Sequence, residues 1–516
     1  MHAVGIVLVL VVLATTVATF ARRLRLPAPS LLVLAGLGVA LVPGVPALRV
    51  APEVIALVVL PPLLYASAEE LSLRDLRTVW RPVTVLAFGL VFASAAAVGF
   101  VAVAVTGLPP AMAFVLGAVL SSTDPVAVSA LGRRLALPGR VQVLVQAESL
   151  FNDATSLVLF RIAVGVAAVA GGTLDLPAAA GQLVLLGGGG SVIGAALAGA
   201  VGLLLRRTAD PVLETVIALV TPYAAYVLAE SAHTSGVTSV VVAGVLLGKE
   251  GHRLTDAHSR LQVNAVYAVV VFLLESVVFS VIGLELPALV RDLPAGTGWW
   301  PLQAALLTVV LIAARVLWTL PLTRAVRPTR GRLSWRVAGV VTWAGTRGVM
   351  PLAAALSIPL AGSGGLPLPG RALVLVLTTA VVVSTLVVQG LTLAAVVHRS
   401  GLALEPEHTA REEARARDAL NRAGLDHVEQ LAGLESVGEV AADRARRGLL
   451  ARLDHADDAD GSADATDAEY RRLRREVITV QNAELHRLYG EHLISDATRR
   501  ALQHDLDREA AALGTP

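Results

Sequence analysis

The apolar residues of this chain are gathered in blocks of about 20, the length needed to cross a bilayer. These blocks fill residues 3–397 of a 516-residue chain, and 55% of all residues are hydrophobic. In hydrocarbon every backbone N–H and C=O group must be paired within the protein, so only helices and closed barrels can span it. Blocks of this length predict helices, and we expect an all-α, polytopic membrane protein.

The blocks predict thirteen spans, of which the fifth and the twelfth are interrupted by polar residues. With the N-terminus outside, nineteen Arg and Lys fall on the cytoplasmic side and three on the outside. This asymmetry is typical of a multi-pass plasma-membrane protein, here one with a cytoplasmic C-terminal tail. The expected spans are 3–20, 29–43, 52–68, 80–106, 110–131, 143–170, 181–205, 212–230, 236–248, 262–286, 299–323, 336–360 and 371–397.

The composition changes after the last block. Residues 1–398 carry 25 Arg and Lys against 16 Asp and Glu, whereas residues 399–516 carry 17 against 24. We therefore expect a transmembrane domain over 1–398 and a helical cytoplasmic tail over 399–516, with an acidic linker near 454–468. The net charge of +2 does not suggest nucleic acid, and the lack of cysteine excludes disulfides and thiolate metal sites.

Polar residues enter the apolar blocks in three places, at residues 121–125, 148–153 and 345–348. A charge at bilayer depth is costly and marks a functional site by default. Pro125 and the glycines of the third motif predict broken helices, which membranes tolerate where the backbone is buried in protein or lines a cavity. Because the fifth and twelfth spans are seven apart, they suit two inverted repeats whose broken helices cross at an ion site.

The residue types at these places suit a hard monovalent cation, which prefers oxygen ligands. Asp153 supplies the charge, and Ser149, four residues earlier, lies on the same helix face. The break at Thr123 and Asp124 frees carbonyl groups and a hydroxyl group. Asp153 can bind a proton or a cation, but not both well, which is the requirement for exchange. Asn152 cannot titrate, so one carboxylate would exchange one proton for one cation.

Two further charged residues of each sign are expected to form buried ion pairs, because an unpaired charge at that depth is very costly. We expect Glu148 to pair with Arg347, and Glu275 of the tenth span to pair with Arg315 of the eleventh. For Glu275 and Arg315 we favour structural charge compensation over a role in transport.

Together these motifs make the chain similar to a known family. It resembles bacterial Na+/H+ antiporters of the monovalent cation:proton antiporter 1 family, which are relatives of the animal sodium–proton exchangers. The resemblance rests on Leu60-Pro61-Pro62-Leu63-Leu64-Tyr65, Ser122-Thr123-Asp124-Pro125, Glu148-Ser149-Leu150-Phe151-Asn152-Asp153, Pro222-Tyr223, Ala229-Glu230, Ser235-Gly236-Val237, Gly345-Thr346-Arg347-Gly348, Thr385 to Thr392, and in the tail Arg474 to Ile478 and Ile494-Ser495-Asp496.

The resemblance implies an inverted-repeat fold with core and dimerisation helices, and a homodimer. It implies that Asp153 is the exchange carboxylate with Asn152 as its companion, and that Thr123, Asp124 and Ser149 lie at the ion site. It also implies the pair of Glu148 and Arg347, and electroneutral exchange. The chain departs from the pattern after Tyr65, where some members place a glutamate near the ion, so no third-span ligand is predicted.

We therefore expect a secondary active antiporter, and not an enzyme, which exchanges Na+ (or Li+ or K+) for H+ and serves pH and sodium homeostasis. Its partners would be monovalent cations, protons, the lipid bilayer and a second copy of the chain, with no cofactor. A K+/H+ antiporter is the alternative within the class. A cation channel would need a filter loop, and an intramembrane protease a catalytic Asp pair or a serine in a glycine-rich elbow; no such motif is evident.

Overall fold

The computed structural model describes residues 2–24, 27–42, 55–124, 139–168, 176–208, 210–294, 297–325, 335–361, 368–401, 406–433, 438–454 and 464–513. The chain divides into two compact units. The first contains residues 1–207, 216–254 and 266–403, and the second contains residues 208–215, 255–265 and 404–516. The acidic linker predicted near 454–468 lies mostly outside the described residues, and so does Pro125.

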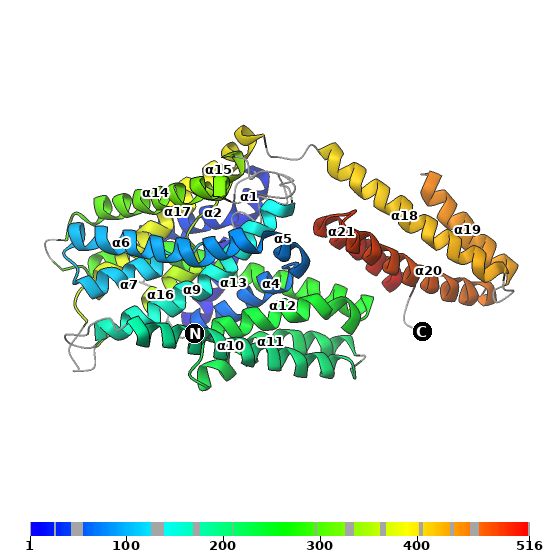
Figure 1. Ribbon diagram of the computed structural model, residues 1–516, viewed down its shortest axis with the longest axis horizontal. Helices are drawn as coiled ribbons and strands as arrows, with labels where there is room; N and C mark the ends of the chain where they lie inside the picture. The colour runs from blue at the N-terminus through cyan, green and yellow to red at the C-terminus, as the bar shows by residue number, and fades with distance from the viewer. Residues whose placement is uncertain are drawn as a thin grey trace. The chain divides into compact units, whose positions relative to one another are not determined.

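The regular elements of the described chain are helices, as predicted (Figure 1). Seven of them are long and apolar enough to cross a membrane. Each of the thirteen predicted spans contains a helix, while the number of crossings and the inverted repeats remain predictions. The helices up to residue 400 are α1 (His2–Leu24), α2 (Ala28–Ala40), η1 (Ile55–Val59), α4 (Leu60–Glu69), α5 (Leu73–Thr84), η2 (Val85–Leu90), α6 (Val91–Thr106), α7 (Pro110–Leu120), α9 (Gly139–Ala168), α10 (Leu176–Leu205), α11 (Pro211–Ser231), α12 (Gly236–Leu254), α13 (Ala257–Arg291), α14 (Trp300–Ala325), α15 (Trp335–Trp343), α16 (Val349–Leu356) and α17 (Arg371–Ser400).

One group of helices in the first unit surrounds the two interrupted spans, and we call it the crossing bundle. In it α6 packs along α7 and α14, α7 packs along α9, and α15 and α16 both pack on α17 (Figure 1). Its buried side chains are mostly Val, Leu and Ala, among them Val115, Leu116 and Val374. This apolar packing holds the polar breaks of α7 and α15 in fixed positions.

A second group, which we call the flanking group, contains α4, α10, α11 and α12. Here α10 and α4 both pack along α12. Glycines allow the close approach of α10 to α12, since a Cβ atom at Gly194 would lie 2.3 Å from the carbonyl oxygen of Ser239. Tyr223 of α11 donates a hydrogen bond to the carbonyl of Val58 at 3.2 Å. Of the crossing bundle, α9 is the helix that packs against α4, α10 and α12.

The second unit contains the helices of the tail, which are α18 (Pro406–Gly433), α19 (Glu439–Asp454), α20 (Asp464–Gly490) and α21 (Asp496–Ala512). Two apolar clusters hold them together, one around Leu485 and Leu502 and the other around Val428 and Leu449. The starts of α11 and α13 also belong to this unit. Within it Arg260 of α13 forms an ion pair with Asp507 of α21.

Candidate functional site

The two interrupted spans are joined where their helices stop. Helix α7 ends at Leu120 and continues as an extended segment to Asp124, and α15 ends at Trp343 before a second extended segment that leads into α16. The N–H group of Asp124 donates to the carbonyl of Thr346 at 2.8 Å, and the Thr346 hydroxyl donates to the carbonyl of Asp124 at 3.1 Å. The predicted breaks are thus confirmed, and each segment satisfies backbone groups that the other leaves without a helical partner.

The Asp124 carboxylate lies against the start of α16. A Cβ atom at Gly348 would be 1.4 Å from Oδ2 of Asp124, so only glycine leaves room for this side chain. Gly348 immediately precedes the first residue of α16. The N-terminal end of a helix favours negative charge, because its first N–H groups are unpaired and its dipole is positive there. Asp124 is therefore placed to stabilise the second half of the interrupted span.

Arg347 lies at the C-terminal end of a helix, whereas Asp124 lies at an N-terminal end. Its guanidinium donates to the carbonyl of Ser121 at 2.8 Å and to the carbonyl of Ser122, both of which follow the last residue of α7. Its backbone N–H donates to the hydroxyl of Thr385 on α17 at 3.1 Å. A positive charge stabilises the C-terminal end of a helix, so the hydrogen bonds of the Arg347 guanidinium stabilise the end of α7.

Asp153 lies near the middle of α9 and is buried, with 4% of its surface exposed. Its Oδ1 accepts a hydrogen bond from the hydroxyl of Ser122, in the extended segment that follows α7. Within the described chain, no Arg, Lys or His forms an ion pair with Asp153. Ser122 was not among the predicted site residues, although its position beside Thr123 and Asp124 in the break was the available signal.

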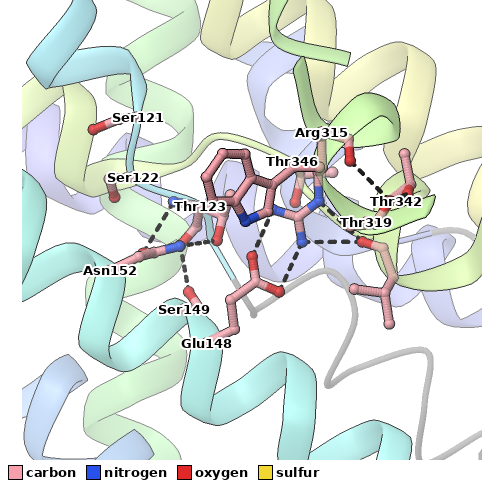
Figure 2. A network of polar contacts seen from close by, with 12 residues as sticks. Ser121, Ser122, Thr123, Glu148, Ser149, Asn152, Arg315, Thr319, Thr342 and Thr346 are labelled. Carbon is pink, nitrogen blue, oxygen red and sulfur yellow. Dashed lines mark hydrogen bonds and ion pairs between the residues drawn. The ribbon is translucent and has the colours of Figure 1, made fainter. Parts of the chain in front are cut away.

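The other predicted site residues of α9 hold the extended segment through Thr123 (Figure 2). The Asn152 amide accepts from the N–H group of Thr123 at 3.3 Å and donates to its hydroxyl at 2.5 Å. The Ser149 hydroxyl donates to the carbonyl of Thr123. The structure therefore brings together Thr123, Ser149, Asn152 and Asp153, and Asn152 acts as a structural link between α9 and the break.

Glu148 pairs with a different arginine from the one predicted. Its carboxylate lies 2.6 Å from Nη1 of Arg315 on α14, and both side chains are almost fully buried (Figure 2). Arg315 also donates to the carbonyl of Val341, near the end of α15, at 3.1 and 3.0 Å. The predicted pair of Glu148 with Arg347 is wrong, because Arg347 points to the end of α7. Each helix that stops at a break thus has an arginine at its C-terminal end, Arg347 for α7 and Arg315 for α15.

The predicted pair of Glu275 with Arg315 is also wrong. Arg315 lies on α14, which packs along α6, α15 and α17. Glu275 lies on α13, where Gly283 instead packs against Val33 of α2. Although Glu275 and Arg315 occupy consecutive predicted spans, their helices face different neighbours.

A buried, titratable carboxylate beside two crossed helix breaks defines a class of protein. The arrangement is that of a carrier for a small cation, in which unwound backbone and polar side chains meet at the middle of a helical membrane domain. Among the described residues no cluster of three or more His, Asp or Glu suits a tightly held metal ion.

Comparison with known proteins gives the family. The model of the family described as "Sodium/hydrogen exchanger, transmembrane" matches residues 8–399, and the chain belongs to this family. It is 33% identical to an uncharacterized Na+/H+ exchanger of Mycobacterium tuberculosis over 99% of this chain and 96% of that one. It is also 33% identical to the Na+/H+ antiporter ApNhaP of Aphanothece halophytica over 73% of this chain and 70% of that one. The fold matches the sodium proton antiporter MjNhaP1 of Methanocaldococcus jannaschii with a TM-score of 0.64 at 21% identity, covering 78% of this chain and 98% of that one.

Proposed function

We propose that this protein exchanges Na+ for H+ across the membrane, and that Asp153 carries the two ions in turn. The observation that carries the proposal is the setting of Asp153, a buried carboxylate that forms no ion pair among the described residues and is held against the broken end of α7 by Ser122. The family and the relatives named Na+/H+ antiporters support the same exchange.

The groups around Asp153 can replace the water that a bare cation loses. The hydroxyls of Ser122 and Ser149 and the freed backbone carbonyls of the break are oxygen donors, the kind that hard cations prefer. In the structure these hydroxyls donate to Asp153 and to the carbonyl of Thr123. When a cation arrives, each hydroxyl can rotate and present a lone pair instead. A proton on Asp153 removes the charge that attracts the cation, so the two ions compete for one site.

One proton for each cation is the stoichiometry that the local charges support. Asn152 cannot titrate, Glu148 is held by Arg315, and the Asp124 carboxylate lies at the start of α16. Among the described carboxylates at the break, Asp153 is then the one that is held neither by an ion pair nor at a helix end. Exchange in liposomes with the voltage clamped by valinomycin and K+ checks this, with Na+ as the driven ion. A rate or end-point that follows the imposed voltage would show that a second carboxylate carries a proton, and Asp124 would be the candidate.

The proposal includes the membrane, the orientation of the chain and its oligomeric state. The positive residues at the predicted span ends favour a multi-pass plasma-membrane protein with its N-terminus outside and its tail in the cytoplasm. Resemblance to the family favours a homodimer. In that setting exchange would serve pH and sodium homeostasis, with no cofactor and no enzymatic step.

Purified protein in liposomes tests the exchange and the choice of ion together. An imposed proton gradient is expected to drive uptake of Na+ against its own gradient, whereas a channel would respond only to the gradient of the cation. The assay is repeated with Li+ and K+. If the proton gradient drives uptake of K+ but not of Na+ or Li+, the K+/H+ alternative is favoured. If it drives uptake of none of the three ions, antiport is contradicted.

A further inference from the structure

Among the described residues, helix α9 makes a polar contact with the flanking group on each side of Asp153. Toward its start, the Gln146 side chain donates to the carbonyl of Ser67 in α4 at 3.1 Å. Toward its end, the Arg161 guanidinium pairs with Glu230 in α11. None of these four residues belongs to the ion site described above.

The two contacts are placed almost symmetrically about Asp153. Gln146 precedes Asp153 by seven residues and Arg161 follows it by eight, which correspond to about 10 and 12 Å along the helix. At 100° per residue Gln146 lies about 20° from Asp153 around α9, whereas Arg161 lies about 80° from it. Both contacts join α9 to the flanking group, one on each side of Asp153 along the helix.

The contact of Arg161 is built from more than one bond. Glu230 Oε1 accepts from Arg161 and also from the N–H group of Gly236 at 3.1 Å, where α12 begins. The same carboxylate thus joins the end of α11, the start of α12 and α9. About a third of each charged side chain is exposed, 39% for Arg161 and 33% for Glu230. This pair is much less buried than that of Glu148 and Arg315, of which 1% and 3% are exposed. Breaking it therefore leaves less deeply buried charges, and the pair can open within a cycle.

We propose that the two contacts are alternating latches, which position α9 so that Asp153 opens to one side of the membrane at a time. This rests on the proposed function, because it takes α9 to move against α4, α11 and α12 during exchange. Both latches are made in this structure, so α9 is held at both ends. Release of Arg161 from Glu230 opens the end toward Ala168, and release of Gln146 from Ser67 opens the end toward Gly139.

The test measures the half-saturating Na+ concentration on each face, in right-side-out and inside-out vesicles. The apparent affinity scales with the fraction of molecules open to that face. Arg161→Gln should therefore lower the half-saturating Na+ concentration at the face near Ala168 and raise it at the other face. Gln146→Leu should do the reverse. A surface ion pair predicts changes of roughly two- to fivefold. Arg161→Lys keeps the charge and is expected to stay near wild type.

Glu230 separates the latch from a purely local role. Glu230→Gln can still accept from Gly236 but loses the charge that binds Arg161, so it should behave like Arg161→Gln. If it behaves like wild type while Glu230→Ala does not, Glu230 serves only the turn before α12 and the latch is excluded.

Accessibility gives a readout that does not depend on transport. The chain has no cysteine, so Leu157→Cys places a single thiol one turn from both Asp153 and Arg161. A membrane-impermeant thiol reagent added at the face near Ala168 should react faster when Arg161→Gln is present and more slowly with Gln146→Leu. Equal reaction rates, or affinity changes of the same sign for both variants, would overturn the proposal. If the wild-type protein shows no proton-coupled Na+ uptake, the proposed function itself is contradicted.

Discussion

Charged side chains form pairs in both units of this molecule, but the surroundings of those pairs differ completely. Glu148 and Arg315, in the membrane domain, expose 1% and 3% of their side chains and link three helices that are distant in sequence. In the tail, Arg487 pairs with Glu484 on its own helix and with Glu491 just after the end of that helix, and about half of the Arg487 side chain is exposed. Removal of one partner leaves an uncompensated charge in the first case and a solvated one in the second.

This difference indicates which charges are associated with transport. In the crossing bundle, Glu148 and Arg315 form an ion pair, and Arg347 and Asp124 each lie at a helix end. Asp153 differs because it accepts a hydroxyl hydrogen bond and forms no ion pair with any residue of the described chain. A buried carboxylate outside an ion pair is the one that a transported ion can bind.

Asp153→Asn should abolish cation-driven proton movement while the protein still folds, because the amide keeps the shape and loses both the charge and the titration. Proteoliposome exchange measures this, with expression level and detergent melting as controls. Normal exchange by well-folded Asp153→Asn would remove Asp153 from the site.

Glu148→Gln and Arg315→Met should each lower the free energy of unfolding by about 3–5 kcal/mol, the typical cost of leaving one partner of a buried pair. Because the second removal takes away the orphaned charge, the double variant should lose less than the sum of the two single losses. Thermal unfolding in detergent measures all three. Strictly additive losses would show that the two residues do not interact.

The same cycle made with Glu148 and Arg347 is the matched control. Arg347 contacts carbonyl groups at the end of α7 rather than Glu148. We expect this second double variant to be closer to additive. A stronger coupling for Arg347 than for Arg315 would restore the pairing predicted from sequence.

Gly348→Ala should reduce exchange and cost about 1–3 kcal/mol, as overpacking does in a tightly packed interior. The added Cβ atom would occupy the position of the Asp124 carboxylate and displace it from the start of α16. Gly339→Ala is the control, because a Cβ atom there meets nothing within 4 Å. Equal behaviour of the two variants would show that the placement of Asp124 is unimportant.

Glu484→Gln in the tail should change the melting temperature far less than Glu148→Gln. Hydrogen bonding from Arg487 lowers the pKa of Glu484, so whatever stability the pair provides is present above the ordinary glutamate pKa. It is lost as the pH falls through the lowered pKa. The melting temperatures of wild type and variant should therefore become more alike as the pH is lowered from 7 into the acidic range. A difference between them that grows on acidification would contradict this.

The sequence predicted those parts of the site that depend on local order. Thr123, Ser149, Asn152 and Asp153 come together as expected, because they lie in two short motifs whose helices pack directly. The breaks at residues 121–124 and 344–348 were predictable from prolines, glycines and polar residues in apolar spans.

The partners of Glu148 and Arg315 could not be predicted in the same way. Pairing was assigned from depth and sign of charge, which several arginines share. The choice between Arg315 and Arg347 depends on the rotation of α14 and on the extended path before α16, and both follow from packing between segments that are far apart in sequence. Ser122 was missed for a related reason, since the direction of a side chain in an unwound segment has no periodicity to predict it.

The central claim is that Asp153 holds either a proton or a cation. Addition of Na+ to the purified protein in weakly buffered solution, followed with a pH indicator, tests it most directly, because a cation that displaces a proton must release it. We expect wild type to release up to one proton for each Na+ bound, and Asp153→Asn to release none. Proton release that persists in Asp153→Asn, or Na+ binding to wild type without any release, would contradict the account.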